Sequence, residues 1–218
     1  MKNRIINNKI IKTLLVLTII ATIIALYINK EYIFLNKVNT NDTIGIIDGR
    51  LSNYHNIISS SNVNYELYGD RKYHGDYLLE FVKNYSDANV SYYDASNSEG
   101  KIKTSEILNG LNWMKENNIK NINISMSSNK FSEELQDWIN KNKEFQIYSS
   151  YNNIENSFDF PAMYENVISS GTSKEIMHKE SDVFYKSNKL IIKFNISKAY
   201  KGNSYLSLVT LLNEMDSK

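Results

Sequence analysis

Four polar residues in this sequence are of the types that carry out acyl transfer. They are Asp48, His74, Asn152 and Ser204. A serine can act as nucleophile, a histidine as its base, an acid can orient that base, and an amide can stabilise an oxyanion. Each of the four ends or follows a predicted strand, or opens a predicted helix. Because functional groups gather at the carboxyl ends of the strands in an open parallel sheet, we expect the four side chains to converge.

Ser204 has the most informative surroundings. It follows a Gly-Asn pair and precedes an apolar-periodic segment, which predicts a buried helix whose first residue is Ser204. Its hydroxyl would then lie beside unsatisfied backbone N–H groups at the positive end of the helix dipole. Taken alone, the position also suits an ordinary N-cap serine. Asp48, His74 and Asn152 have similar alternatives as a cap, a surface residue and a turn residue, so the prediction rests on their combination.

The segments that would position these residues alternate between strand and helix patterns. Strands are predicted at 43–48, 89–94, 119–125, 144–149 and 166–170, and helices at 74–83, 104–117, 132–140 and from 204 onward. Thr104 is expected to cap its helix. The segment 183–196 has the pattern of a hairpin with Ser187 and Asn188 in its turn. This alternation predicts an α/β fold, a three-layer, mostly parallel sheet flanked by helices.

The amino-terminal part has the pattern of a membrane anchor. An uncharged apolar run covers 13–28, and lysine and arginine are concentrated before it. The run predicts one N-terminal transmembrane helix, with the start of the chain in the cytoplasm and the rest outside the cell membrane. A cleaved signal peptide is the alternative, but no convincing small-x-small cleavage site follows the run. We therefore divide the chain into a cytoplasmic start and signal anchor (1–29), a stalk (30–42) and one catalytic-type domain (43–218).

Composition narrows the classes of partner and cofactor. The net charge is +1, so no basic surface for nucleic acid is predicted. The chain has no cysteine, which excludes a disulfide, a thiolate nucleophile and a cysteine metal site. No acidic segment has the spacing of a metal loop, and we predict neither a metal nor a cofactor. The sequence does not indicate an oligomeric state.

Six short motifs, in chain order, resemble those of the subtilisin-like serine proteases. Their order of Asp, His and Ser is the one known for subtilisin. The best match is the Phe-Pro-Ala-Met-Tyr run, which contains the only proline of the chain. The motifs are Gly-Ile-Ile-Asp-Gly at 45–49, His-Gly at 74–75, Asn-Ile-Asn-Ile-Ser-Met at 121–126, Ser-Ser-Tyr-Asn-Asn at 149–153, the run at 160–171, and Gly-Asn-Ser-Tyr-Leu-Ser at 202–207.

The resemblance implies a role for each matched residue. Asp48, His74 and Ser204 would form the catalytic triad, and Asn152 would be the oxyanion donor. The substrate would be a peptide or protein, bound in an extended form by Ser125, Met126, Ser127 and Ser150. Together, the resemblance and the predicted membrane anchor imply an extracytoplasmic, membrane-anchored serine endopeptidase.

Departures from the family pattern keep two other hypotheses open. Ser127 and Tyr151 stand where the family has glycine, and no proline follows Ser204. A catalytically weak or inactive member of this fold, which binds peptides or regulates a partner, would accommodate these changes. The third hypothesis is an unrelated anchored α/β domain that binds a ligand, in which Asp48, His74 and Ser204 would lie far apart.

Overall fold

A computed structural model describes most of the chain. The described residues are 11–22, 32–35, 37–52, 59–61, 72–97, 99–152, 158–171, 182–186, 190–193 and 199–216. The predicted hairpin turn at Ser187 and Asn188 lies outside these ranges, as do residues 23–28 of the predicted membrane anchor.

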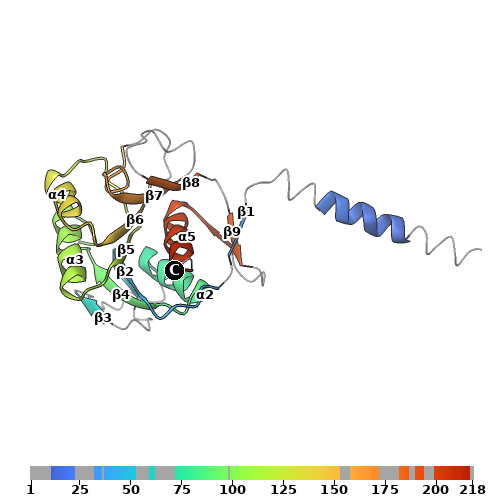
Figure 1. Cartoon of the computed structure of the whole chain (residues 1–218), viewed down its shortest axis with the longest axis horizontal. Helices are drawn as coiled ribbons and strands as arrows, with labels where there is room; N and C mark the ends of the chain where they lie inside the picture. Colours follow the sequence, from blue (N-terminus) through green and yellow to red (C-terminus); the bar gives the residue numbers. More distant parts are fainter. Residues whose placement is uncertain are drawn as a thin grey trace, which may run out of the picture.

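A seven-stranded sheet, parallel throughout, forms the centre of the molecule (Figure 1). Its strand order is β3-β4-β2-β5-β6-β7-β8. The central strands are buried over most of their residues, as expected for parallel strands that are covered on both faces. The bounds are β2 Thr43–Asp48, β3 Ser59–Ser61, β4 Asn89–Asp94, β5 Asn121–Ile124, β6 Gln146–Ser150, β7 Val167–Gly171 and β8 Asp182–Lys186.

Four helices cover the two faces of this sheet. Helices α2 (His74–Tyr85) and α5 (Asn203–Asp216) pack in one apolar core, and α3 (Thr104–Glu116) and α4 (Glu133–Lys141) pack in the other. Neighbouring residues of one strand enter opposite cores, since Ile46 faces α2 and α5 while Ile47 faces α3 and α4. The predicted three-layer α/β architecture is therefore confirmed. Figure 1 shows the two helix pairs on opposite sides of the strands.

The predicted hairpin over 183–196 is wrong. Its first arm, β8, pairs in parallel with β7 at the edge of the large sheet. Its second arm, β9 (Leu190–Lys193), belongs to a separate three-stranded sheet with β1 (Tyr32–Leu35) and β10 (Ala199–Lys201). Two apolar runs close in sequence have the pattern of a hairpin, but here each run pairs with a strand from another part of the chain.

Helix and strand boundaries differ from the predictions by a few residues. Strands 43–48 and 89–94 are as predicted, whereas β5 is shorter than the predicted 119–125. Thr104 is the first residue of α3 and not its cap, because Lys103 occupies the cap position without a side-chain hydrogen bond. Helix α5 begins at Asn203, so Ser204 is its second residue. Gly202 precedes it at φ 123°, a conformation that glycine adopts without strain.

The amino-terminal segments contribute two further observations. Residues 11–22 form a helix whose residues are all exposed, including the apolar Leu14, Leu15 and Leu17. Across the residues that the structure describes, no helix is long and apolar enough to cross a membrane. The segment 30–42, predicted as a stalk, contains strand β1 and the buried Val38, whose backbone pairs with Tyr85 and Asp87. Part of it is thus packed against the domain.

Candidate active site

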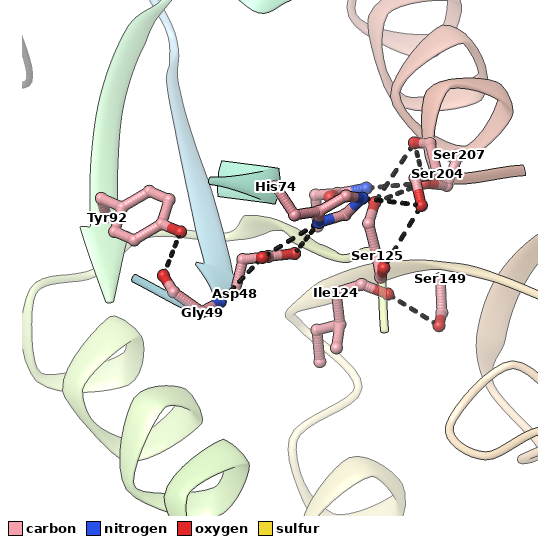
Figure 2. Close-up of polar contacts among 10 residues, drawn as sticks. Asp48, Gly49, His74, Tyr92, Ile124, Ser125, Ser149, Ser204 and Ser207 are labelled. Atoms are coloured by element: carbon pink, nitrogen blue, oxygen red, sulfur yellow. Dashed lines mark hydrogen bonds and ion pairs between the residues drawn. The ribbon is translucent and has the colours of Figure 1, made fainter. Parts of the chain in front are cut away.

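Asp48, His74 and Ser204 lie in one chain of polar contacts, drawn in Figure 2. His74 Nδ1 is 3.0 Å from both carboxylate oxygens of Asp48, and His74 Nε2 is 3.2 Å from Ser204 Oγ. Asp48 ends β2, His74 opens α2, and Ser204 lies in the first turn of α5. The fold thus brings together three residues that are distant in sequence, as predicted from their places at strand and helix ends.

The contacts determine how the imidazole is protonated. Asp48 is 2% exposed, and an ionised carboxylate can only accept hydrogen bonds, so neutral His74 carries its proton on Nδ1. Its Nε2 is then free to accept the proton of the Ser204 hydroxyl. Burial by itself lowers the pKa of His74, but the hydrogen bond and the charge of Asp48 outweigh it, and the pKa lies above its ordinary value of 6.5. The arrangement can therefore stabilise an imidazolium while a serine loses its proton.

Tyr92 holds the turn that follows Asp48. This β4 residue is fully buried, and its hydroxyl donates a 2.6 Å hydrogen bond to the carbonyl oxygen of Gly49. Burial, followed by the charges of Asp48, Asp94 and Asp76, raises the pKa of Tyr92 well above its ordinary value, so the phenol stays protonated. The same hydroxyl explains the glycine after His74, because a Cβ at position 75 would lie 2.0 Å from Tyr92 Oη.

A buried carboxylate on α2 anchors the start of that helix. Asp76 accepts hydrogen bonds from the backbone N–H of Tyr73 at 2.6 Å and from that of Ser52 at 2.9 Å. The first contact completes the helix cap, and the second ties the segment after β2 to α2. His74 lies between Tyr73 and Asp76 in the sequence, so these contacts fix the helix start that carries it, next to Asp48 at the end of β2.

A buried polar network contacts the main-chain carbonyl of Ser204. The sequence analysis did not predict this network. Ser125 Oγ contacts Asn123 Oδ1 at 2.7 Å, Ser207 Oγ at 3.0 Å and the carbonyl oxygen of Ser204 at 3.2 Å. Ser207 Oγ also donates to the Ser204 carbonyl at 2.9 Å and accepts from Asn123 Nδ2 at 2.9 Å. The available signals were the alternation of Asn123 and Ser125 with isoleucine along the predicted strand, and the spacing of Ser204 and Ser207 by one helical turn.

Asn152 lies immediately after β6, beside the start of α5. Asn203 Nδ2 donates to the main-chain oxygen of Asn152 at 2.7 Å, and Asn203 directly precedes Ser204. The side-chain amide of Asn152 donates to the carboxylate of Asp159. The structure therefore brings Asn152 next to the serine helix, with its amide held by a residue that the sequence analysis did not single out.

The four residues predicted to bind substrate differ in their surroundings. Ser125 turns its hydroxyl into the buried network, Ser127 is exposed, and Ser150 is buried in β6, where it pairs with Ser170. Only Met126 lines the cleft beside His74, which has a volume of about 610 Å³. The cleft is lined by Asp48, Gly49, Arg50, Tyr73, His74, Glu99, Gly100, Ile102 and Met126. Among the described residues, no group of three or more His, Cys, Asp or Glu side chains could hold a metal ion.

Comparison with known proteins identifies the fold. No protein-family model matches the chain, and no curated protein matches it. Among solved structures, the chain is similar to the psychrophilic subtilisin-like protease Apa1 from the Antarctic psychrotroph Pseudoalteromonas sp. AS-11, with 17% identity and a TM-score of 0.50. The fold is subtilisin-like. The match covers 66% of this chain and 39% of that protease, so the chain spans well under half of its length.

The His74–Asp48 contact predicts the titration of the imidazole. His74 should titrate above 6.5 in the wild-type chain, and Asp48→Asn should lower this pKa because the negative charge that stabilises the imidazolium is then lost. The measurement is the pH dependence of the His74 ring signals in NMR spectra of the full chain, assigned with His74→Gln. Asp94→Asn, at the register-matched position of β4, is the control and should shift the pKa less. Equal shifts in the two variants would contradict the assignment.

The contact between Gly75 and Tyr92 predicts a stability difference between two glycine substitutions. Gly75→Ala places a methyl group against the buried phenol and should lower the free energy of unfolding by about 1–3 kcal/mol. Gly49→Ala is the control, because its added carbon comes no closer than 3.6 Å to Ile102, and it should change stability by at most about 0.5 kcal/mol. Urea unfolding measures both values. If the two substitutions lower the free energy of unfolding equally, Tyr92 is not the reason for glycine at position 75.

Proposed function

We propose that this chain is a membrane-anchored serine endopeptidase whose catalytic domain, 43–218, lies outside the cytoplasm. The observation that carries the proposal is the continuous contact from Asp48 through His74 to Ser204. A carboxylate, an imidazole and a hydroxyl that meet at the carboxyl edge of a subtilisin-like sheet, next to a cleft, are arranged for nucleophilic catalysis.

The proposed reaction is the hydrolysis of a peptide bond through an acyl-enzyme. Ser204 Oγ attacks the peptide carbonyl carbon while its proton passes to His74 Nε2. Asp48 keeps the Nδ1–H oriented and stabilises the imidazolium without taking a proton itself. The C–N bond then breaks as His74 returns the proton to the leaving amine. A water molecule gives a proton to the same nitrogen and attacks the acyl carbon. The C–O bond to Ser204 then breaks as His74 returns that proton to Ser204 Oγ, and the new carboxyl group is released.

The negative charge on the carbonyl oxygen needs donors that are already in place. Ser204 lies in the first turn of α5, where backbone N–H groups lack partners within the helix. Its N–H and the side-chain amide of Asn152 are the proposed pair of donors. Loss of one such donor from an oxyanion site costs roughly 100- to 1,000-fold in rate.

The proposed substrate is an extended peptide. The segment 125–127 continues past the end of β5, and it offers backbone groups for pairing by strand addition. Met126 and Ile102 provide apolar contacts in the cleft beside His74, and Arg50 and Glu99 provide charges of both signs. These features suit an unfolded or flexible segment of a polypeptide rather than a compact small molecule.

A second candidate function is peptide binding or regulation without turnover. It is favoured by the bulk of Tyr151, a buried residue that stands where the family has glycine. In this alternative the cleft would retain a peptide and Ser204 would not react.

We also propose that the amino-terminal helix attaches the protein to a membrane. Its described part, 11–22, exposes apolar side chains that lack cover from the domain, with Leu14, Leu15 and Leu17 each more than half exposed. The apolar run continues in sequence to residue 28. Lysine and arginine before the run favour an orientation with the domain outside the cytoplasm.

Covalent labelling with a fluorophosphonate probe tests the proposed activity. We expect the full wild-type chain to be labelled, Ser204→Ala and His74→Ala to lose all labelling, and Asn152→Ala to react roughly 100- to 1,000-fold more slowly. Ser105→Ala, an exposed serine of α3, is the control and should be labelled like wild type. A folded wild type that resists the probe would favour the peptide-binding alternative.

Membrane attachment predicts behaviour in fractionation. The full chain expressed in bacteria should stay with the membrane fraction after alkaline carbonate washing, and its domain should be digested by protease added outside spheroplasts. Replacement of Leu14, Leu15 and Leu17 by Asp should release the chain, because a charge at the centre of a membrane helix is costly. Release of the wild-type chain by carbonate would contradict the anchor.

A further inference from the structure

Asp159 is a fully buried carboxylate next to the proposed oxyanion residue. It is 0% exposed, and it accepts a hydrogen bond from Asn152 Nδ2. We propose that Asp159 is a positioning residue that sets the orientation of the Asn152 amide for catalysis. This inference rests on the proposed function and identifies the group on which its oxyanion donor depends.

The chemistry of the two side chains decides which group of the Asn152 amide faces Asp159. An asparagine amide can present either its oxygen or its NH2 group to a neighbour, and the two orientations have almost the same shape. In the structure the NH2 group faces Asp159 and donates to its carboxyl oxygen, which is the orientation that an acceptor at this position selects. One N–H is used in this contact, and the second N–H points about 120° away in the amide plane, as sp² geometry requires. A flipped amide would instead present an oxygen, which repels an oxyanion.

The backbone of Asn152 is held independently of its side chain. Asn203 Nδ2 donates to the Asn152 main-chain oxygen at 2.7 Å, and the Tyr151 N–H donates to the Ser170 carbonyl at 2.9 Å. Asn203 is 1% exposed and is the first residue of α5, so the backbone of Asn152 is tied to the helix that carries Ser204. With the backbone held, the remaining freedom lies in the side-chain torsions, and the Asp159 contact limits these.

Asp159 itself lies on a rigid support. Its main-chain oxygen accepts from the Met163 N–H at 2.9 Å. The next residue, Phe160, pairs with Ser128 through two backbone hydrogen bonds of 2.8 and 2.9 Å. Ser128 directly follows the proposed substrate segment 125–127. The carboxylate is therefore fixed relative to both the oxyanion residue and the segment that would hold the substrate.

Burial explains why the contact persists. A carboxylate removed from water is stable only when donors satisfy it, so Asp159 attracts the amide strongly and resists its rotation. A surface carboxylate would exchange the amide for water. The prediction is that the orientation of the Asn152 side chain, and not only its presence, depends on residue 159.

A double-mutant cycle in the full chain tests this proposal. Asp159→Leu should lower kcat for a peptide substrate by about tenfold or more, though by no more than Asn152→Ala does, while KM stays within about twofold. Asp159→Asn should recover most of the loss, because its amide oxygen can accept the same hydrogen bond. The Asp159→Leu, Asn152→Ala double variant should be no slower than Asn152→Ala alone, since the two residues act as a unit.

Three kinetic results would overturn the proposal. The first is a loss of kcat in the double variant that equals the product of the losses in the two single variants. The second is Asp159→Asn as slow as Asp159→Leu with unchanged thermal stability. The third is an effect confined to KM for substrates with lysine or arginine before the cleaved bond, because Asp159 would then contact the substrate and not Asn152.

A measurement without turnover keeps the test separate from that of the proposed function. The Nδ2–H pair of Asn152 is assigned in NMR spectra by its loss in Asn152→Ala. In the wild type one proton of the pair should be shifted downfield and protected from exchange, in Asp159→Asn the shift should be smaller, and in Asp159→Leu it should be absent. Unchanged signals in Asp159→Leu refute the positioning role. An inactive wild type with the expected signals refutes only the peptidase proposal.

Discussion

The buried carboxylate of Asp48 is the interaction on which the site depends. A carboxylate at 2% exposure needs donors, and it receives them from His74 Nδ1 and from the Gly49 N–H at 2.7 Å. Tyr92 fixes the carbonyl of the same turn, and its hydroxyl leaves no room for a side chain at position 75. The turn, the histidine and the glycine that follows it thus form one packing unit around a single buried charge.

The parallel sheet places further polar side chains at the same edge as this unit. Strands β2, β5 and β6 are neighbours, and their carboxyl ends carry Asp48, Ser125 and Asn152. Helices α2 and α5 cover the same face and contribute His74 and Ser204. Both helices pack in one apolar core, and this packing places the imidazole and the hydroxyl of their first turns 3.2 Å apart.

Two buried polar groups complete the arrangement, and they act on different atoms. The network of Asn123, Ser125 and Ser207 holds the carbonyl of Ser204 and hence the first turn of α5. Asp159 holds the amide of Asn152. Buried polar groups of this kind contribute little to stability on balance, but once satisfied they restrict the site to one geometry.

Local patterns were sufficient to predict the central strands and the covering helices, because burial periodicity and helix starts are properties of adjacent residues. They also placed Asp48, His74 and Ser204 at the strand and helix ends where the structure has them. They could not place β8 and β9 in different sheets or pair β1 with β9, since strand pairing joins segments that are far apart in sequence. Nor could they assign Asn123, Ser207 or Asp159, whose roles come from partners on other elements. The sequence by itself determined the layers and the types of side chain at the candidate site. The tertiary structure alone decided how those side chains are oriented, because orientation depends on buried hydrogen bonds between distant segments.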